Sequence, residues 1–376
     1  MRILFTFIGG SGHFRPLVPF ARAAQAAGHT VAVAGSGGRF EEITAAGFTA
    51  LRTSEPKPRS ADEPEQRLEP VDLAREEQVM RDGFAGRGAR RHAELLREIA
   101  LDWKPDVIVR DEVDFGSAIA AETLGIPCVN VIVLLAGGLT RKDVIHDPIA
   151  ALRTEHGLAP DPELTRLNGQ LVIMPAPPSL RDPRYPLPPD TFWCAPGTRV
   201  PNRAHRAPST VEPLIYFTLG TLDTYRDVFE RVLAALRDLP VRVVATVGRQ
   251  LDPASFGPQP DHVRIEQFIP QDEILTEADL VIAHGGSGTL IGSLAHGIPS
   301  LLLPMGADQP HNTGRCVELG TALELDPVTF TPDAAARAVT TLLHEATYRQ
   351  AAQRIQAEIN TLPEPADALP LIEALA

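Results

Sequence analysis

Residues 283–299 read Ala283-His284-Gly285-Gly286-Ser287-Gly288-Thr289-Leu-Ile-Gly-Ser-Leu-Ala-His296-Gly297-Ile298-Pro299. An apolar strand enters a turn rich in glycine, and the serine and threonine of the turn begin a helix. The backbone N–H groups of such a helix start can bind a diphosphate without cationic side chains. A glycine then ends the helix before the next strand, as it does in residues 124–127. This strand–turn–helix unit is typical of an α/β fold with a parallel sheet.

The same alternation of short apolar runs and helical patterns occurs in both halves of the chain. In the first half we expect strands at residues 3–8, 31–34, 106–109, 128–134 and 171–174, and helices at 16–27, 40–46, 72–100 and 115–124. In the second half we expect strands at 214–219, 241–247 and 263–268, a helix at 225–239, further alternation to 325, and helices from about 331. The sequence therefore predicts two Rossmann-like parallel-sheet domains.

The boundary between these domains is predicted by a segment rich in arginine and proline at residues 195–213. We expect a first domain at residues 1–200, a linker at 201–213, a second domain at 214–358 and a C-terminal helix at 359–376. A second segment without hydrophobic periodicity, at 53–70, predicts an exposed loop before the helix at 72–100.

The composition is that of a globular protein and excludes several classes. The 376 residues are 44% hydrophobic and 22% charged, which excludes a disordered chain and a small disulfide scaffold. The formal net charge of −13 opposes binding to nucleic acid or to an anionic membrane. Three scattered cysteines favour a reducing cytoplasm, and neither a signal peptide nor an apolar run of about 20 residues is apparent.

A glycine-rich turn at Gly9-Gly10-Ser11-Gly12-His13-Phe14-Arg15-Pro16 follows the first predicted strand. The G-x-G-x-x-G fingerprint of dinucleotide-binding proteins fits poorly, because Arg15 stands where the third glycine belongs, and this argues against a dehydrogenase. His13 comes just before a helix that starts with proline, at the edge of the sheet where such folds bind ligands. His13 is therefore a candidate catalytic base, and the alternative is a histidine that packs within the loop.

A second candidate segment is Arg110-Asp111-Glu112-Val113-Asp114, at the end of a predicted strand. A carboxylate at this position can bond one imidazole nitrogen of His13 and stabilise the imidazolium that forms when the other nitrogen takes a proton. We assign this role to Asp111 and consider Glu112 a poorer candidate. The alternative is that Asp111 or Asp114 caps the next helix, and Asp114 is better placed to do so.

The third segment, Pro304-Met305-Gly306-Ala307-Asp308-Gln309-Pro310, follows another predicted strand. Asp308 and Gln309 together offer acceptors and a donor suited to sugar hydroxyls. Alone, the same residues could be a helix cap followed by a proline in the first turn.

Taken together, these segments resemble the bacterial natural-product glycosyltransferases of family 1, which are inverting enzymes with the GT-B fold. The resemblance covers nearly the whole chain and is most specific over His284–Thr289, Gly297–Pro299 and the Asp308-Gln309 pair with Asn312. It implies two domains that face each other across a cleft, with a C-terminal helix that returns to the first domain.

The resemblance also implies roles for residues of the second domain. The residues that match diphosphate-binding positions are His284, Gly286, Ser287, Gly288, Thr289 and Thr221. Asp308 and Gln309 match donor-sugar positions. Phe268 and Ile269 stand where relatives have the first residues of Trp-x-Pro-Gln, so Phe268 either stacks on the nucleotide base or is a core strand residue.

One position departs from the family pattern. Relatives that use uridine diphosphate sugars often carry a glutamate, which bonds the ribose hydroxyls, where this chain has Gly292. Without that acceptor, a ribose 2′-hydroxyl adds no favourable binding free energy. We therefore expect a thymidine diphosphate donor that carries a deoxysugar.

The implied function is transfer of a sugar from this donor to a hydroxyl of a hydrophobic natural product such as a polyketide or macrolide. His13 acts as the base and Asp111 as its partner, and we expect no cofactor and, because no D-x-D motif occurs, no metal. The acceptor should lie beside His13, among residues 53–90 and the side chains of Phe14, Phe84, Phe115 and Leu134, unless these pack within their own domain. The alternatives are a nucleotide-sugar epimerase of the same fold and a silent nucleotide-sugar-binding or activator protein. A homodimer, the sugar and the acceptor are left open.

Overall fold

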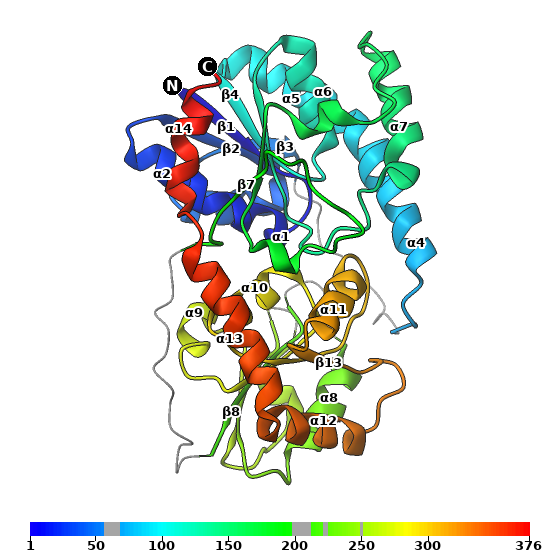
Figure 1. The fold of residues 1–376 in the computed structure, drawn as a ribbon, viewed down its shortest axis with the longest axis vertical. Coiled ribbons are helices and arrows are strands. Elements are labelled where there is room, and N and C mark those ends of the chain that lie inside the picture. The colour runs from blue at the N-terminus through cyan, green and yellow to red at the C-terminus, as the bar shows by residue number, and fades with distance from the viewer. Residues whose placement is uncertain (56–67, 198–211, 221–224, 249–250) are drawn as a thin grey trace. The chain divides into compact units, whose positions relative to one another are not determined.

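A computed structural model describes residues 1–55, 68–197, 212–220, 225–248 and 251–376. The chain divides into two compact units (Figure 1). Unit 1 comprises Met1–Glu63, Leu73–Thr198 and Leu362–Ala376, and unit 2 comprises Pro64–Asp72 and Arg199–Thr361. The predicted linker lies almost wholly outside the described residues, and Thr221 also lies outside them.

Unit 1 is built on a seven-stranded parallel sheet with the strand order β3-β2-β1-β4-β5-β6-β7. The strands are β1 Arg2–Thr6, β2 Thr30–Ser36, β3 Thr49–Ser54, β4 Val107–Asp111, β5 Cys128–Val131, β6 Leu171–Met174 and β7 Phe192–Trp193. The chain order reverses between β1 and β4, and open α/β sheets bind ligands at such a switch point, beyond the carboxyl ends of the strands. The segments that carry His13 and Asp111 follow or end these two strands.

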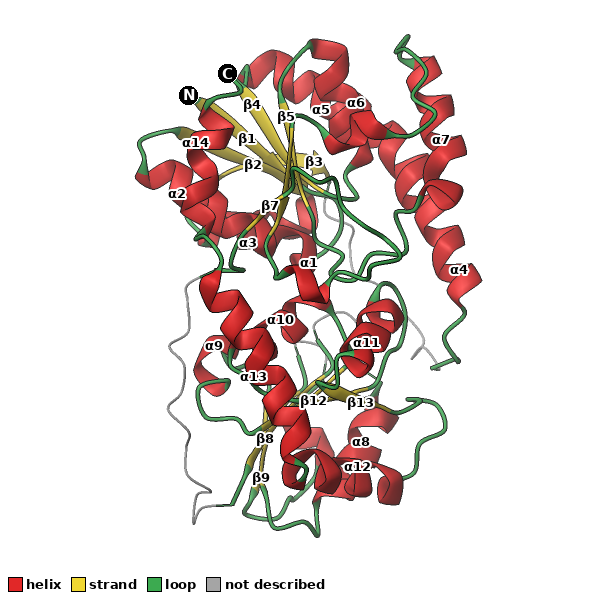
Figure 2. Cartoon of the chain, viewed as in Figure 1, coloured by secondary structure: helices red, strands yellow, loops and turns green. Residues whose placement is uncertain are grey.

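Helices cover both faces of this sheet because both faces are apolar. Ile3 and Phe5 of β1 belong to one buried cluster and Leu4 to another. The α-helices of unit 1 are α1 Ser11–Phe14, α2 Val18–Ala26, α3 Phe40–Ala45, α4 Leu73–Gln78, α5 Ala89–Trp103, α6 Phe115–Leu124, α7 Lys142–Glu155 and α14 Leu369–Glu373. Short 3-10 turns are η1 Arg15–Leu17, η2 Gly37–Arg39, η4 Thr165–Asn168, η5 Pro178–Leu180 and η7 Pro365–Ala368. Figure 2 shows these helices around the sheet.

The helix predicted over residues 72–100 differs in one respect from the observed structure. Between α4 and α5 lies η3, a π-helix over Val79–Gly88. A π-helix is rare and has wider turns than an α-helix, and it is often found at functional sites. Strand β3 and helix α7 were not predicted, because the alternation over residues 49–54 is weak and because Pro148, inside α7, indicates a helix break in the sequence.

Unit 2 has a six-stranded parallel sheet with the order β10-β9-β8-β11-β12-β13. Its strands are β8 Leu214–Thr218, β9 Arg242–Thr246, β10 Val263–Glu266, β11 Leu280–Ala283, β12 Ser300–Leu302 and β13 Ala322–Glu324. Its helices are α8 Arg226–Leu236, η6 Pro253–Phe256, α9 Gln271–Ile274, α10 Ser287–Ala295, α11 Gln309–Glu318, α12 Pro332–His344 and α13 Ala346–Thr361. The switch point lies between β8 and β11, where the glycine-rich segment begins. The predicted α/β class with two parallel Rossmann-like sheets is confirmed.

The last residues of the chain, 362–376, belong to unit 1. The backbone of Ala195 donates to the carbonyl of Pro363 at 2.8 Å. Further along, Nε2 of His29 lies 2.7 Å from Oε1 of Glu373, so α14 is tied to the start of β2. Within the described ranges, no helix is long and apolar enough to cross a membrane.

Candidate active site

His13 lies in the short helix α1, directly after the turn that follows β1. Its Nδ1 atom lies 3.4 Å from Oδ2 of Asp111, and the two side chains are 21% and 0% exposed. Gly9 makes this position possible, because its φ is +108° and an added Cβ would lie 2.9 Å from Cδ2 of the His13 ring. The structure thus brings together the two residues that the sequence predicted as base and partner.

The Asp111 carboxylate is held by three backbone amides as well as by its contact with His13. Oδ2 accepts from Ile8 N at 3.0 Å, and Oδ1 accepts from Val113 N at 2.7 Å and Asp114 N at 2.8 Å. These donors come from the loop after β1 and from the turn that leads to α6. A buried carboxylate with this set of donors has a fixed orientation.

Asp114, the alternative cap, has a separate role. Its side chain caps α6 by accepting from Ser117 N at 3.1 Å, which confirms that it is the better cap. Its Oδ1 lies 2.7 Å from Nδ1 of His92, and its Oδ2 accepts from Thr6 Oγ1 at 2.7 Å. Burial by itself raises the pKa of Asp114, but His92 and the hydroxyl donors outweigh burial and lower that pKa to about 2.

Glu112, the poorer candidate for the partner of His13, instead holds the loop after β5. Its Oε2 accepts from Val133 N at 3.3 Å and Leu134 N at 3.1 Å, and its Oε1 accepts from Thr140 Oγ1 at 2.7 Å. Arg181 supports the same loop by donating to Leu134 O at 3.1 Å. Burial lowers the pKa of Arg181, and the nearby charge of Glu112 opposes this effect.

Arg110 fixes the main chain at the end of β4. Its side chain is fully buried, and its Nη1 donates to Asp111 O at 2.8 Å and Glu112 O at 2.9 Å. Its Nη2 donates to Leu167 O. No role was predicted from the sequence for Arg110, His92 or Arg181. Arg110 could have been identified from the sequence, because an arginine is unusual within an otherwise apolar strand.

The four predicted acceptor contacts have different environments. Phe84 stacks on His13, with ring centroids 6.2 Å apart and planes at 29°. Phe14 is a core residue that is 2% exposed and packs 5.3 Å from Phe7. Phe115 and Leu134 are 2% and 7% exposed and lie in a buried cluster that Phe84 covers in part. Among these four side chains, only Phe84 is partly exposed beside His13.

In unit 2 the glycine-rich segment forms the start of α10, as predicted. Gly286 is the N-cap, with extended backbone angles and no side-chain capping bond. As a glycine, Gly286 supplies no side-chain cap to the first-turn N–H groups of this helix. The positive end of the helix dipole adds to these donors, so this helix start can hold a phosphate group.

His284 lies immediately before this helix start. An added Cβ at Gly220 or Gly286 would lie 2.8 Å or 2.4 Å from its ring, so the imidazole fits only between two glycines. Burial lowers the pKa of His284 to about 4, against a smaller opposing effect of Asp308. The ring is thus neutral at pH 7. Its buried Nδ1 has no hydrogen-bond partner within the described part of the chain.

Asp308 and Gln309 lie at the start of α11, close to the start of α10. Asp308 is the N-cap of α11 but makes no side-chain capping bond there. Its Oδ2 instead accepts from Ser287 Oγ at 2.7 Å and Asn312 Nδ2 at 2.7 Å. Oε1 of Gln309 accepts from Met305 N at 2.8 Å. The structure therefore joins Ser287 and Asp308, which lie 21 residues apart in the sequence.

The predicted base-binding segment lies beyond the end of β10. Phe268 is 62% exposed, so the alternative that it is a core strand residue is wrong. The strand ends at Glu266, two residues before Phe268. Ile269 is half-buried.

Gly292 is the position where relatives often carry a glutamate. An added Cβ there would lie 3.1 Å from Cδ1 of Leu275 and 3.4 Å from Nε2 of Gln271.

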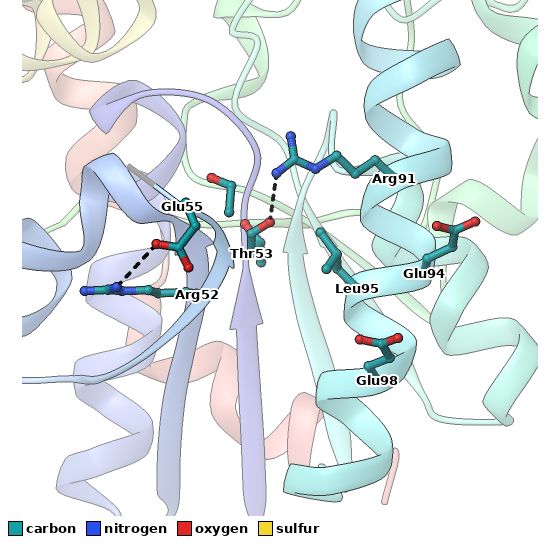
Figure 3. A pocket seen from close by; sticks show the side chains of 8 residues that line it. Arg52, Thr53, Glu55, Arg91, Glu94, Leu95 and Glu98 are labelled. Carbon is teal, nitrogen blue, oxygen red and sulfur yellow. Dashed lines mark hydrogen bonds and ion pairs between the residues drawn. The ribbon is translucent and has the colours of Figure 1, made fainter. Parts of the chain in front are cut away.

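A cavity in unit 1 lies apart from these residues (Figure 3). It measures about 390 Å³ and lies between the end of β3 and α5. Its lining residues are Arg52, Thr53, Ser54, Glu55, Arg91, Glu94, Leu95 and Glu98. Residues 53–55 are the described start of the region predicted to face the acceptor, whose residues 56–67 lie outside the description. Three glutamates and two arginines line the cavity, so the side-chain charges on its walls nearly balance.

The described residues contain no group of three or more His, Cys, Asp or Glu side chains placed to hold a metal ion. All three cysteines are buried and unpaired. Burial raises the pKa of Cys194 to about 12 and that of Cys316 to about 11, so these thiols are protonated at pH 7.

The fold and the two sites define a class of α/β protein with two Rossmann-like domains, one of which presents a helix start suited to phosphate. Residues 230–375 match the family described as the C-terminal domain of erythromycin biosynthesis protein CIII-like proteins. The whole chain is 28% identical to aclacinomycin-T 2-deoxy-L-fucose transferase of Streptomyces galilaeus, of which 96% is covered. It is 29% identical to 10-deoxymethynolide desosaminyltransferase of Streptomyces venezuelae, with 100% of this chain and 97% of that protein covered.

Solved structures give the same result. The glycosyltransferase VinC in complex with dTDP has a TM-score of 0.76 and 26% identity, with 100% of this chain and 99% of that chain covered. SnogD from Streptomyces nogalater has a TM-score of 0.76 and 26% identity, with 100% of both chains covered. The chain is thus a homologue of the macrolide and aromatic polyketide glycosyltransferases, and it has the GT-B fold. The resemblance inferred from the sequence is confirmed, because the relatives and the solved structures that match the whole chain are sugar transferases of antibiotic biosynthesis and glycosyltransferases.

Proposed function

We propose that the protein transfers a deoxysugar from a thymidine diphosphate donor to a hydroxyl of a hydrophobic natural product, with inversion at the anomeric carbon. The observation that carries the mechanism is the 3.4 Å contact between His13 Nδ1 and Asp111 Oδ2. With Nδ1 oriented by the carboxylate, Nε2 of a neutral His13 takes the proton of the acceptor hydroxyl. The hydroxyl oxygen attacks the anomeric carbon, and the bond to the diphosphate breaks in the same step.

Asp111 stabilises the imidazolium that this proton transfer creates. Its orientation is preset by the amides of Ile8, Val113 and Asp114, so little reorganisation is needed during the reaction. A carboxylate in this position holds the ring with Nε2 toward the substrate, as in a catalytic triad.

The negative charge that develops on the leaving diphosphate is stabilised by the start of α10. The N–H groups at Ser287, Gly288 and Thr289 supply the donors, and the neutral His284 ring can donate one further N–H. The donor sugar is bound by Asp308 and Gln309. In this proposal Asp308 is held for that contact by Ser287 and Asn312.

The thymidine preference is supported by two observations. Gly292 offers no side-chain acceptor for a ribose 2′-hydroxyl. The related structure of VinC was determined with dTDP. Phe268, which is 62% exposed, would stack on the base, with Ile269 beside it. We propose that no metal and no further cofactor take part, and exhaustive chelation that stops turnover until a divalent ion is restored would disprove this.

The acceptor is proposed to bind beside His13. Phe84 offers a partly exposed aromatic surface there, next to a buried apolar cluster. A hydrophobic aglycone fits this chemistry, and the two relatives named above are a 2-deoxy-L-fucose transferase and a desosaminyltransferase. These activities favour a transferase over an epimerase of the same fold or a silent activator.

The decisive experiment is calorimetric titration with dTDP and, separately, UDP, followed by a timed transfer assay with wild type and His13→Ala. Tighter dTDP binding and loss of transfer in the variant are expected. Tighter UDP binding would overturn the donor assignment alone. A His13→Ala protein with full transfer activity would overturn the mechanism, and absence of binding to either nucleotide would overturn the function.

A further inference from the structure

A π-helix delivers one aromatic ring to the face of the His13 imidazole. Phe84 lies in the middle of η3, and its ring is 6.2 Å from the His13 ring with planes at 29°. This distance lies within the range of about 4.5–7 Å over which aromatic pairs interact. The histidine thus contacts Asp111 at one nitrogen and an aromatic ring on its face.

The π-helix depends on glycine at its end. An added Cβ at Gly88 would lie 2.7 Å from the carbonyl oxygen of Gly83 and 3.2 Å from Cδ1 of Ile8. At Gly86 the added atom would lie 3.1 Å from Arg81 O. Since both close approaches are to residues five positions earlier, the wide turn needs small residues at its end. Gly88 therefore allows the wide turns of η3 and its close packing against Ile8, in the loop between β1 and His13.

Gly9 restricts another edge of the His13 imidazole. A Cβ there would lie 2.9 Å from Cδ2 and 3.3 Å from Nε2 of His13. The turn backbone therefore approaches the Cδ2–Nε2 edge closely and leaves it clear of any side chain of its own. Asp111, Gly9 and Phe84 together restrict the imidazole from three directions.

We propose that Phe84 is a positioning residue for His13: its ring holds the imidazole in the reactive orientation and stabilises the imidazolium by a cation–π interaction. This rests on the proposed role of His13 as the base. A cation near an aromatic face is stabilised by the negative charge of that face. The stabilisation grows as His13 takes up the acceptor proton, so the ring assists the step in which the proton moves.

Apart from Asp111, charged side chains of η3 and of the segment after His13 contact groups other than the imidazole. Asp111 contacts the ring directly. Arg81 and Asp82 of the same π-helix contact Val144 O and Gln78, and Arg15 pairs with Glu42. Loss of the Phe84 ring therefore removes one contribution to the imidazolium and leaves the Asp111 contribution in place.

The test compares Phe84→Leu with Phe84→Tyr in the full chain. Leucine keeps an apolar side chain but removes the aromatic face, whereas tyrosine keeps the face. NMR titration of the His13 ring, assigned by its disappearance in His13→Gln, should show a pKa about half a unit lower in Phe84→Leu and unchanged in Phe84→Tyr. The acid limb of kcat/KM against pH should move down by the same amount, and kcat should fall several-fold.

A second variant changes the contact between Phe84 and His13 by moving the backbone of η3. Gly88→Ala should displace η3 and give the same direction of change in the His13 titration while Phe84 itself is unaltered. An unchanged His13 pKa in folded Phe84→Leu would overturn the proposal, because a purely structural role lowers kcat without shifting the titration. The titration needs no turnover, so it gives an answer even if His13→Ala proves active and the proposed mechanism fails.

Discussion

Oδ2 of Asp111 is shared between Nδ1 of His13 at 3.4 Å and the amide of Ile8 at 3.0 Å. Ile8 lies in the same turn as His13, so one carboxylate oxygen fixes both the histidine and the backbone that carries it. The other oxygen accepts two amides at the start of the next turn. The pair is therefore rigid because both strand ends are joined by a single side chain.

Replacement of Asp111 by asparagine should remove most of the activity. The amide keeps the size of the side chain but loses the charge that stabilises the imidazolium, and its NH₂ group faces backbone donors. We expect kcat/KM to fall by at least about 100-fold and the thermal unfolding midpoint to fall by a few degrees, because the NH₂ group cannot accept from the backbone donors. A timed transfer assay checks this, and a loss of no more than twofold would contradict the proposed pair.

Truncation of Glu112 should destabilise unit 1 and weaken acceptor binding. Glu112→Ala leaves the amides of Val133 and Leu134 without their acceptor and removes a negative charge near the buried Arg181, which should cost about 3 kcal/mol in the free energy of unfolding. The KM for the acceptor should rise more than the KM for the donor.

Glu155→Ala is the matched control for Glu112→Ala. Glu155 makes a 2.7 Å ion pair with Arg90 in the same unit, but both side chains are nearly half exposed. Exposed pairs contribute little to stability, so urea unfolding of Glu155→Ala should match wild type. Equal losses in the two variants would show that the loop after β5 does not depend on Glu112.

Asp114 should make the protein sensitive to acid over a defined pH range. Its pKa is lowered from 3.8 to about 2 in the folded state, so its contribution is present above about pH 4 and is lost as the pH falls toward 2. The shift corresponds to about 2 kcal/mol. Urea unfolding at several pH values should show a smaller loss of stability between pH 4 and 2 in Asp114→Asn than in wild type, and identical slopes would contradict this assignment.

Much of the fold could be predicted because its signals are local. Short apolar runs closed by glycine predicted the central strands, and the strand expected at residues 106–109 is β4, which extends two residues further, to Asp111. The π-helix could not be predicted, since an apolar period over residues 72–100 does not distinguish a wider turn from an α-helix. Strand β3 was missed because its alternation is weak, with Leu51 partly exposed.

The only site residues that could be predicted from the sequence were those whose role follows from their residue type and their position at a strand end. A histidine after one strand and an acid at the end of its neighbour meet because parallel strands present their carboxyl ends at one edge. Contacts between distant segments, such as His92 with Asp114 or Glu112 with the loop after β5, leave no trace in a single sequence. Phe14 was expected near the acceptor because it follows His13, but its ring lies in the core beside Phe7.

The fit of His284 between two glycines gives a further prediction. Gly286→Ala places a methyl group 2.4 Å from Nε2 of His284 and should displace the ring and the helix start beside it. We expect dTDP affinity to fall at least tenfold by calorimetry. Gly314→Ala in α11 is the control, because an added Cβ there meets nothing within 4 Å and alanine favours a helix. Wild-type affinity in Gly286→Ala would contradict the proposed diphosphate site.

The donor preference can be changed at Gly292 if the proposal is correct. Gly292→Glu adds a carboxylate that can accept from ribose hydroxyls, and only UDP offers the 2′-hydroxyl, so the ratio of UDP to dTDP affinity should rise about tenfold. The added Cβ has limited room, with Leu275 Cδ1 at 3.1 Å, so Gly292→Ala is needed to measure the steric cost alone. Calorimetry with both nucleotides on both variants separates the two effects. If glutamate and alanine lower both affinities equally, the ribose does not lie beside Gly292, and the thymidine preference must come from contacts to the base near Phe268.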